Sequence, residues 1–324
     1  MLLEMMNDYM PEWLIYTIGG GSAFLITLLL LIKPFPFLPK DGGKKVETPD
    51  GRIVVINDKS NGKTTGVGLV FVIIFLLASV LFLPVDTELL IYVGLMFLMM
   101  LTGYLDDAAT TPWGELVKGI LDLVLSVGAV VTFLSFHTSD VTLFGNTFHM
   151  PVWLYAILGV VLMWTSINVT NCSDGVDGLC GSVTIVSLVA YYLLFQNEMP
   201  TYTWMGVLMS SVLLAYLIFN WNPSKVLMGD AGSRTIGFLL ALMAMQSGHP
   251  FIFLLMSIVF IFDGGMGLIK VSLIRFLKIN AFPNVTFPFH DHMRKKMGIP
   301  IKMIPLIFCM IQVVFCAIAA AIVL

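Results

Sequence analysis

Long apolar runs separated by short polar connections make up most of the chain. A membrane-spanning helix needs about 20 mainly apolar residues, and the hydropathy of the chain predicts about ten such spans. They cover residues 12–32, 66–83, 88–105, 115–136, 151–169, 179–196, 202–220, 234–247, 250–277 and 301–323. The pattern therefore predicts an all-α integral membrane protein, with residues 1–324 forming a single polytopic domain.

One connection has a different pattern. Over residues 141–150 (VTLFGNTFHM), apolar and polar positions roughly alternate on either side of Gly145-Asn146. A glycine-asparagine pair is typical of a two-residue hairpin turn. We expect a small β-hairpin here, outside the membrane and with a structural role.

Composition supports this membrane interpretation. Charged residues make up 11% of the chain and apolar residues 58%, whereas a soluble domain carries about a quarter charged residues. The net charge of −3 and the lack of a basic block argue against a nucleic-acid partner. The cysteines are Cys172, Cys180, Cys309 and Cys316. Their spacing is typical of neither a zinc finger nor a redox motif.

The lysines and arginines all lie in alternate connections between the predicted spans or in the ends of the spans next to them. Of the 17, seven lie in residues 33–63, one is Lys118, two are Lys225 and Arg234, and seven lie in residues 270–302. The other connections carry acidic residues but no basic ones. Because positive residues mark the cytoplasmic side, these four connections are predicted to be cytoplasmic. An even number of spans then places both termini outside.

Two adjacent carboxylates, Asp106 and Asp107, end the third predicted span. Like charges at a span terminus need a cation or water, so a solvated helix end is one interpretation. The other is binding of a divalent metal or abstraction of a proton. Mg²⁺ takes oxygen ligands and usually combines one or two carboxylates with substrate phosphates.

A second polar cluster follows the fifth predicted span. Asn168 and Asn171 are three residues apart, as are Asp174 and Asp177, so each pair could share one face of a helix. An asparagine- and aspartate-rich loop is also an ordinary turn. Four such side chains within ten residues at a membrane boundary favour contact with a ligand.

A third cluster, Met228-Gly229-Asp230, lies before the eighth predicted span. Asp230 could hold a metal or could cap the following helix. The small residues after it expose backbone N–H groups near a helix N-terminus, which is a natural phosphate site.

The last basic connection contains His290-Asp291-His292, followed by the basic triplet 294–296. Residues two apart project to one side of an extended segment, and two histidines with an acid are compatible with a transition-metal site. The basic triplet argues for an anionic ligand, so we favour contact with a diphosphate over zinc.

Two further charges lie within predicted spans. Lys118 opens the fourth span, where it could meet a phosphate, pair with Asp122 or extend to the membrane surface. Asp263 lies inside the ninth span, where an unpaired charge is costly. The glycines that follow Asp263 indicate a bend or break there, and we expect Asp263 to make a structural hydrogen bond at it.

These clusters converge on one predicted face of the membrane, an arrangement suited to phosphoryl transfer onto a substrate that lives in the bilayer. The chain resembles the polyprenyl-phosphate N-acetylhexosamine-1-phosphate transferases. The resemblance covers nearly the whole chain: the spans, the outward hairpin, the outward termini and the motifs in family order.

The resemblance assigns roles to the first and third clusters. Asp106 and Asp107 match the family's paired aspartates, one of which is proposed to deprotonate the lipid phosphate. Gly229 and Asp230 match its Met-Gly-Asp, whose aspartate holds Mg²⁺. Lys118 matches a lysine at the start of the fourth span.

The resemblance also assigns residues to the nucleotide donor. Asn168, Asn171, Asp174 and Asp177 match the family's Asn-x-x-Asn-x-x-Asp-Gly-x-Asp-Gly stretch, which contacts the donor. Lys63, in NGKTTGVG, matches a basic residue of the first cytoplasmic loop.

The chain departs from the family at two positions. His290 and His292 match the outer positions of a His-His-His motif, but Asp291 replaces the middle histidine, so the role of that imidazole is not carried over. Leu227 stands where an aromatic often stacks on the uracil, so recognition of the base must depend on other groups.

The implied activity is Mg²⁺-dependent transfer of phospho-N-acetylmuramoyl-pentapeptide from its UDP donor to undecaprenyl phosphate in the bacterial plasma membrane. The products are lipid I and UMP. The alternative in the same family is a sister transferase that uses UDP-N-acetylglucosamine for teichoic acid or O-antigen. An alternative from another class is a cation-coupled transporter, because transporters carry polar residues at broken helices. The oligomeric state, a homodimer included, stays open.

Overall fold

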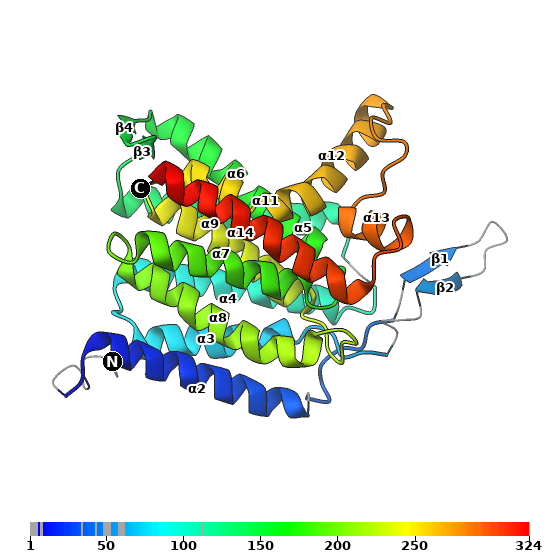
Figure 1. Cartoon of the computed structure of the whole chain (residues 1–324), viewed down its shortest axis with the longest axis horizontal. Coiled ribbons are helices and arrows are strands. Elements are labelled where there is room, and N and C mark those ends of the chain that lie inside the picture. Colours follow the sequence, from blue (N-terminus) through cyan, green and yellow to red (C-terminus); the bar gives the residue numbers. More distant parts are fainter. Residues whose placement is uncertain are drawn as a thin grey trace.

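Most of the apolar runs form helices with the predicted bounds (Figure 1). The structure, a computed structural model, describes residues 6, 9–33, 35–42, 44–47, 53–57, 62–111 and 113–323. The long helices are α2 (Glu12–Ile32), α3 (Gly68–Phe82), α4 (Thr87–Asp107), α5 (Glu115–Phe136), α6 (Val152–Ser173), α7 (Leu179–Phe195), α8 (Pro200–Asn220), α9 (Gly229–Gln246) and α14 (Ile304–Val323).

The ninth predicted span is broken, but the break lies at Ser257 and not at the glycines after Asp263, where the helix instead makes a π-helical turn. This span comprises η1 (Pro250–Ile252), α10 (Phe253–Met256), α11 (Ile258–Phe260), the π-helical turn η2 (Ile261–Gly265), α12 (Met266–Ser272) and a second π-helical turn, η3 (Leu273–Leu277). The two parts of this segment, on either side of Ser257, are bent by 69°. In Figure 1, α12 projects away from the bundle. A short helix α13 (Phe289–Lys295) and the turn η4 (Ile301–Met303) precede α14.

Six helices of the described chain are long and apolar enough to cross a membrane, or seven if the bent segment counts as one span. The six are α2, α4, α5, α6, α8 and α14 together with η4. Helices α3 and α7 are apolar but shorter. The structure is thus mostly helical with several candidate spans, and a crossing by all ten segments stays a prediction.

The predicted hairpin is present, with its turn one residue earlier than expected. Strands β3 (Asp140–Leu143) and β4 (Asn146–His149) pair antiparallel, with Leu143 opposite Asn146. The turn residues are therefore Phe144 and Gly145, and both have positive φ, 47° and 73°. Two positive φ angles are typical of the turn that matches the twist of a hairpin.

A second hairpin lies in the first basic connection, where the sequence predicted only a loop. Strands β1 (Lys44–Glu47) and β2 (Ile53–Asn57) pair antiparallel. Two of the basic residues assigned to this connection, Arg52 and Lys59, lie outside the described residues.

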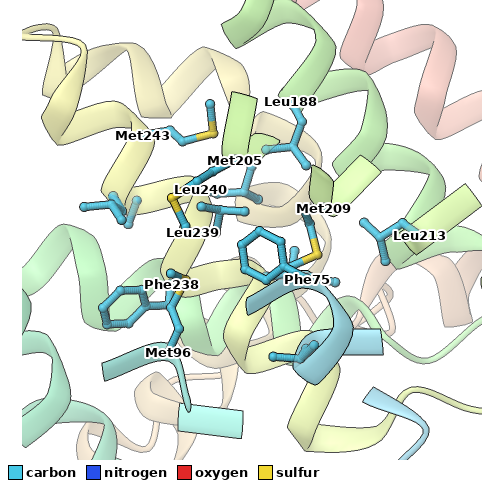
Figure 2. Close-up of a cluster of buried hydrophobic side chains, with 14 of the residues drawn as sticks. Phe75, Met96, Leu188, Met205, Met209, Leu213, Phe238, Leu239, Leu240 and Met243 are labelled. Atoms are coloured by element: carbon cyan, nitrogen blue, oxygen red, sulfur yellow. The ribbon is translucent and has the colours of Figure 1, made fainter. Parts of the chain in front are cut away.

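Helix α9 lies at the centre of the bundle. Every residue from Ala231 to Met245 is buried, and the helix contacts α3, α4 and α6 along its length. From Ile236 to Met245 the helix is apolar on all sides, and such a helix belongs inside a bundle rather than at its surface. Figure 2 shows side chains of α9 among those of α3, α4 and α8, including Phe238, Leu239, Met243, Phe75, Met96, Met205 and Met209. The neighbouring helices therefore fix both ends of α9 in space.

The bundle has two distinct ends. In Figure 1, β1, β2 and α13 lie at one end, and β3, β4, the start of α2 and the end of α14 lie at the other. We call the first the α13 end and the second the β3–β4 end. The first turn of α9 lies at the α13 end.

Candidate active site

The first turn of α9 carries the Gly-Asp motif. Helix α9 begins at Gly229, five residues before the predicted span at 234, so the motif is helical rather than part of a loop. The Asp107 carboxylate accepts the backbone N–H groups of Asp230 at 3.2 Å and of Ala231 at 3.4 Å. Two of the N–H groups at this helix N-terminus, those of Asp230 and Ala231, are thus held by the protein's own carboxylate.

Close approach of α4 to α9 requires glycine at two positions. Gly229 has a φ of +68°, and a Cβ there would collide with the Asp107 carboxylate. A Cβ on Gly103, one turn before Asp107, would lie 2.5 Å from Ala231 N. The glycines therefore let the two helix ends meet, which places Asp107 against the start of α9.

Lys118 bridges two of the predicted site carboxylates. Its Nζ forms an ion pair with Asp106 and lies 3.1 Å from Asp230 Oδ2. Asp106 is buried, and its other oxygen accepts the N–H of Trp113 at 2.6 Å. The structure therefore joins Lys118 to Asp106 and Asp230, and the pairing with Asp122 that the sequence allowed is wrong.

The two asparagines share one face of α6, as their spacing predicted. Asn171 Nδ2 donates to Asp230 Oδ1 at 2.8 Å and to Ser233 Oγ at 3.0 Å. Asn168, one turn deeper, lies 3.5 Å from Asp122 Oδ2. Each oxygen of Asp230 thus faces a donor from a different helix, Asn171 of α6 or Lys118 of α5.

Asp174 and Asp177 lie in a turn between α6 and α7 and not on a helix. The prediction that they share one helical face is therefore wrong. Asp177 accepts the hydroxyl of Ser224 at 2.7 Å and the amide of Asn222 at 2.9 Å. Lys63 donates to Ser224 Oγ at 2.8 Å. Asp177 therefore ties Lys63 and the connection after α8 to this turn.

Asp174 lies at the C-terminus of α6 and faces the other acids. Desolvation, followed by the negative charges of Asp230, Asp107 and Asp177, raises the pKa of Asp174 well above its usual value. A bound cation would favour its ionised form.

Two polar cavities open at this end of the bundle, with volumes of about 710 and 610 Å³. We call the larger the acidic cavity and the smaller the loop cavity. Asp41, Asp174 and Leu227 line both cavities, which are therefore adjacent. The acidic cavity is also lined by Asp106, Asp107, Lys118, Asn171, Gly229 and Asp230. The loop cavity is also lined by Lys63, Asp177, Asn222, Ser224 and Arg294.

The acidic cavity offers the ligands that Mg²⁺ prefers. Its carboxylate and amide oxygens are hard donors, and Asp107, Asp230 and Asn171 supply them from three helices. Within the described ranges, no three histidine, cysteine or acidic side chains form a group that could hold a metal alone. The residues therefore fit an ion that shares its coordination with substrate phosphates.

The two histidines of the last connection do not project to one side, because the segment is the helix α13 and not extended. His290 is buried, and its Nδ1 lies 2.7 Å from Asp263 Oδ2. Its backbone N–H donates to the other oxygen of Asp263 at 2.7 Å. Asp263 therefore makes the structural hydrogen bond that the sequence predicted, but in the π-helical turn η2 and not at the break, and it holds His290 through both carboxylate oxygens. His290 Nε2 faces the turn at Gly175, where a Cβ would lie 2.5 Å from it.

The other two residues of the motif make local contacts. His292 accepts the N–H of Thr286 at 3.3 Å. Asp291 pairs with Arg294 and Lys295 on its own helix, both at 2.6 Å. Although partial burial opposes ionisation, Lys295 and Arg294 hold the pKa of Asp291 below its usual value. The structure thus brings neither His292 nor Asp291 into contact with Asp230 or with its partners Lys118 and Asn171.

One buried ion pair was missed by the sequence analysis. Arg234 was counted among the loop cations but lies inside α9 with only 2% of its surface exposed. It binds the carboxylate of Asp122 on α5, which is equally buried. The signal was present, because both charges lie within or at the edge of apolar runs, where a charge needs a partner.

An apolar groove of about 780 Å³ runs beside the site. It lies between α6 and the broken segment, with Trp164, Val169, Phe262 and Phe276 among its lining residues.

Comparison with known proteins identifies the family of the chain. The model of glycosyl transferase family 4 matches residues 89–248, which include Asp106, Asp107, Lys118 and Asp230. A phospho-N-acetylmuramoyl-pentapeptide-transferase of Treponema pallidum is 36% identical over 297 residues, covering 85% of this chain and 80% of its own. The chain belongs to glycosyl transferase family 4.

More distant members of the family show the same coverage. Proteins of the same name from Thermotoga neapolitana and Streptococcus agalactiae are 28% and 27% identical. They cover 84% and 85% of this chain, and 88% and 87% of their own. As a member of glycosyl transferase family 4, the chain is a phospho-sugar transferase acting on a polyprenyl phosphate.

Proposed function

We propose that this enzyme transfers phospho-N-acetylmuramoyl-pentapeptide from its UDP donor to undecaprenyl phosphate, with Mg²⁺ as cofactor. The observation that carries the proposal is the convergence on Asp230 of Lys118 and Asn171, with Asp107 beside it at the start of α9. The names of the similar proteins support the choice of donor.

Asp230 and Asp107 would hold Mg²⁺, with the amide oxygen of Asn171 within the same cavity. The ion would neutralise the charge of the donor diphosphate as the bond to UMP breaks.

The chain's own residues place the lipid phosphate and receive its proton. An oxygen of the polyprenyl phosphate attacks the β-phosphorus of the donor, and the bond from that phosphorus to the bridging oxygen breaks, releasing UMP. Lys118 stands between Asp106 and Asp230, where its ammonium can attract a phosphate into the acidic cavity. A carboxylate of the Asp106–Asp107 pair accepts a proton that the attacking phosphate carries.

The loop cavity suits the nucleotide part of the donor. Lys63 and Arg294 line it and can face phosphate oxygens. Leu227 lies between the two cavities. Because leucine has no aromatic face, it offers the uracil apolar contact in place of stacking.

The apolar groove suits the polyprenyl chain. Its lining on α6 and the broken segment is largely apolar, and α6 also carries Asn171 at the acidic cavity. A lipid in this groove would have its phosphate at the end of α6, next to the reacting groups.

The charge distribution supports an active site on the cytoplasmic side of the plasma membrane, with ten crossings and both termini outside. Helices α4 and α9, the third and eighth predicted spans, run in opposite directions, which supports an even number of crossings between them. Asp107 ends α4 beside the first turn of α9, and Glu88 starts α4 beside Gln246 at the end of α9.

A competition assay tests the donor. Purified enzyme in detergent receives polyprenyl phosphate, Mg²⁺ and equal concentrations of UDP-N-acetylmuramoyl-pentapeptide and UDP-N-acetylglucosamine, and the lipid products are separated by chromatography. We expect the muramoyl-pentapeptide lipid to dominate, UMP to equal the lipid product, and chelation of Mg²⁺ to stop both. A dominant N-acetylglucosamine lipid would overturn the donor assignment in favour of the sister transferases.

A further inference from the structure

The polar residues at the start of α9 form two layers, each built from the same three helices. The upper layer consists of Lys118 on α5, Asn171 on α6 and Asp230 on α9. The lower layer, one turn further into the bundle, consists of Asp122 on α5, Asn168 on α6 and Arg234 on α9. Residues three or four apart lie above one another on a helix, so each helix contributes one residue to each layer.

The lower layer is tightly bound and has no role in the chemistry proposed above. Arg234 Nε donates to Asp122 Oδ1 at 3.1 Å, and its Nη2 contacts the same oxygen. Asp122 Oδ2 lies 3.5 Å from Asn168 Nδ2, whose shorter bond, 2.8 Å, goes to Trp164 O. Neither Asp122 nor Arg234 lines the acidic cavity or the loop cavity.

This layer is costly to maintain. Arg234 and Asp122 are each 2% exposed, and Arg234 Nη1 has no hydrogen-bond partner in the part of the chain that the structure describes. Removing two charges from water costs several kcal/mol per ion, and an apolar pair of similar volume is often as stable. Stability alone is therefore a weak reason for this pair.

The charge order of the two layers is inverted. In the upper layer the cation is on α5 and the anion on α9, whereas in the lower layer the anion is on α5 and the cation on α9. A slide of one turn between these helices would place Lys118 beside Arg234 or Asp122 beside Asp230. Either contact would bury like charges together, so the inverted order permits a single register. Specifying register is the best-attested use of buried polar groups.

We propose that Asp122 and Arg234 are positioning residues that fix the register of α5 on α9, so that Lys118 reaches Asp230. This inference rests on the proposed function, because it assigns Lys118 and Asp230 to the reaction. The pair acts through these two residues and does not touch the substrates.

The test replaces the pair with apolar residues of similar size, Asp122→Leu with Arg234→Met. We expect this double variant to fold with a melting temperature close to the wild type. Its kcat should fall at least about tenfold, because a misplacement of about 1 Å can cost up to about 10²-fold. The KM for the donor should stay nearly constant, since the loop cavity proposed for its nucleotide keeps all of its lining residues.

Two further variants separate positioning from packing. Arg234→Lys keeps the cation and the register, so it should retain most of the kcat that the apolar pair loses. Thr235→Val is the matched control on α9 and should leave kcat unchanged. Among the residues that the structure describes, the Thr235 hydroxyl bonds only to its own helix, at Ala231 O. If the apolar pair does not yield folded enzyme, Asp122→Asn with Arg234→Gln repeats the test with a neutral polar pair, and the same loss of kcat is expected.

The two proposals fail in different ways. Wild-type enzyme that forms no lipid product with either UDP-sugar would overturn the proposed function. A folded neutral pair, apolar or polar, with the kcat of the wild type would overturn the positioning role alone. A raised KM at unchanged kcat would also overturn it, because the pair would then act on binding.

Discussion

Helices α4, α5 and α9 carry a polar network at each end of the bundle, but the two networks face different surroundings. At the β3–β4 end, Glu88 of α4 binds His137, which follows α5, at 2.9 Å, and Gln246 of α9 at 2.6 Å. At the α13 end, α4, α5 and α9 bring together Asp107, Lys118 and Asp230.

The difference lies in the cavities beside the two networks. The groups of the α13 end line the acidic cavity. At the β3–β4 end, the cavity beside Met245 and Pro250 is lined almost only by apolar side chains. Polar residues of the same types can therefore serve chemistry at one end and packing at the other. Removing a charge should cost turnover at the α13 end and stability at the β3–β4 end.

The largest effect is expected from Asp230→Asn. The change keeps the shape but removes the charge proposed to hold Mg²⁺, so UMP release should fall by at least about 10²-fold. The melting temperature of the purified protein should hardly change. Near-normal turnover would exclude Asp230 as a metal ligand and leave it only as a structural partner of Lys118 and Asn171.

His290→Ala should reduce turnover about tenfold, because the imidazole packs between Asp263 and the turn at Gly175, and a shift of this turn would misplace the lining of the loop cavity. Added Zn²⁺ should not restore activity, and elemental analysis of the wild type should show no stoichiometric zinc. A tightly bound zinc that this variant loses would show that the motif is a transition-metal site.

Glu88→Gln provides the contrast at the β3–β4 end. The amide keeps the shape but loses the charge-assisted bond to His137, so the free energy of unfolding should fall by about 1 kcal/mol. The kcat should match the wild type. A variant of normal stability and low turnover would break the comparison between the two ends.

The smallest effect is expected from Asp291→His, which introduces the residue typical of the family. It removes the ion pairs to Arg294 and Lys295, and partly exposed pairs contribute less than about 1 kcal/mol each. Because Arg294 lines the loop cavity, the KM for the donor should rise by no more than about fivefold, with kcat unchanged. A changed kcat in titrations of the donor would place Asp291 at the reaction itself.

The sequence predicted the helices well because each apolar run is long and uninterrupted. The bounds of α2 and α5 agree with the predicted spans, whereas the break of the ninth span lies at Ser257 and not at the glycines that predicted it. The face shared by Asn168 and Asn171 was also predicted, because α6 continues through both.

Contacts between segments that are distant in the sequence could not be predicted from the apolar pattern. The Asp107 carboxylate caps α9 across more than a hundred residues, and periodicity contains no information on such a pairing. Arg234 was assigned to a loop because hydropathy does not show that α9 starts five residues earlier. His290 and His292 were placed on an extended segment because a single short turn of helix leaves no periodic pattern.

The central claim is that chemistry occurs only at the α13 end, on the cytoplasmic side. Sealed inside-out and right-side-out membrane vesicles containing the enzyme test it most directly, because a charged UDP-sugar does not cross the bilayer. With donor added outside, we predict lipid product from inside-out vesicles and none from right-side-out vesicles until detergent opens them. Equal product from sealed vesicles of both orientations, or product from right-side-out vesicles alone, would contradict the account.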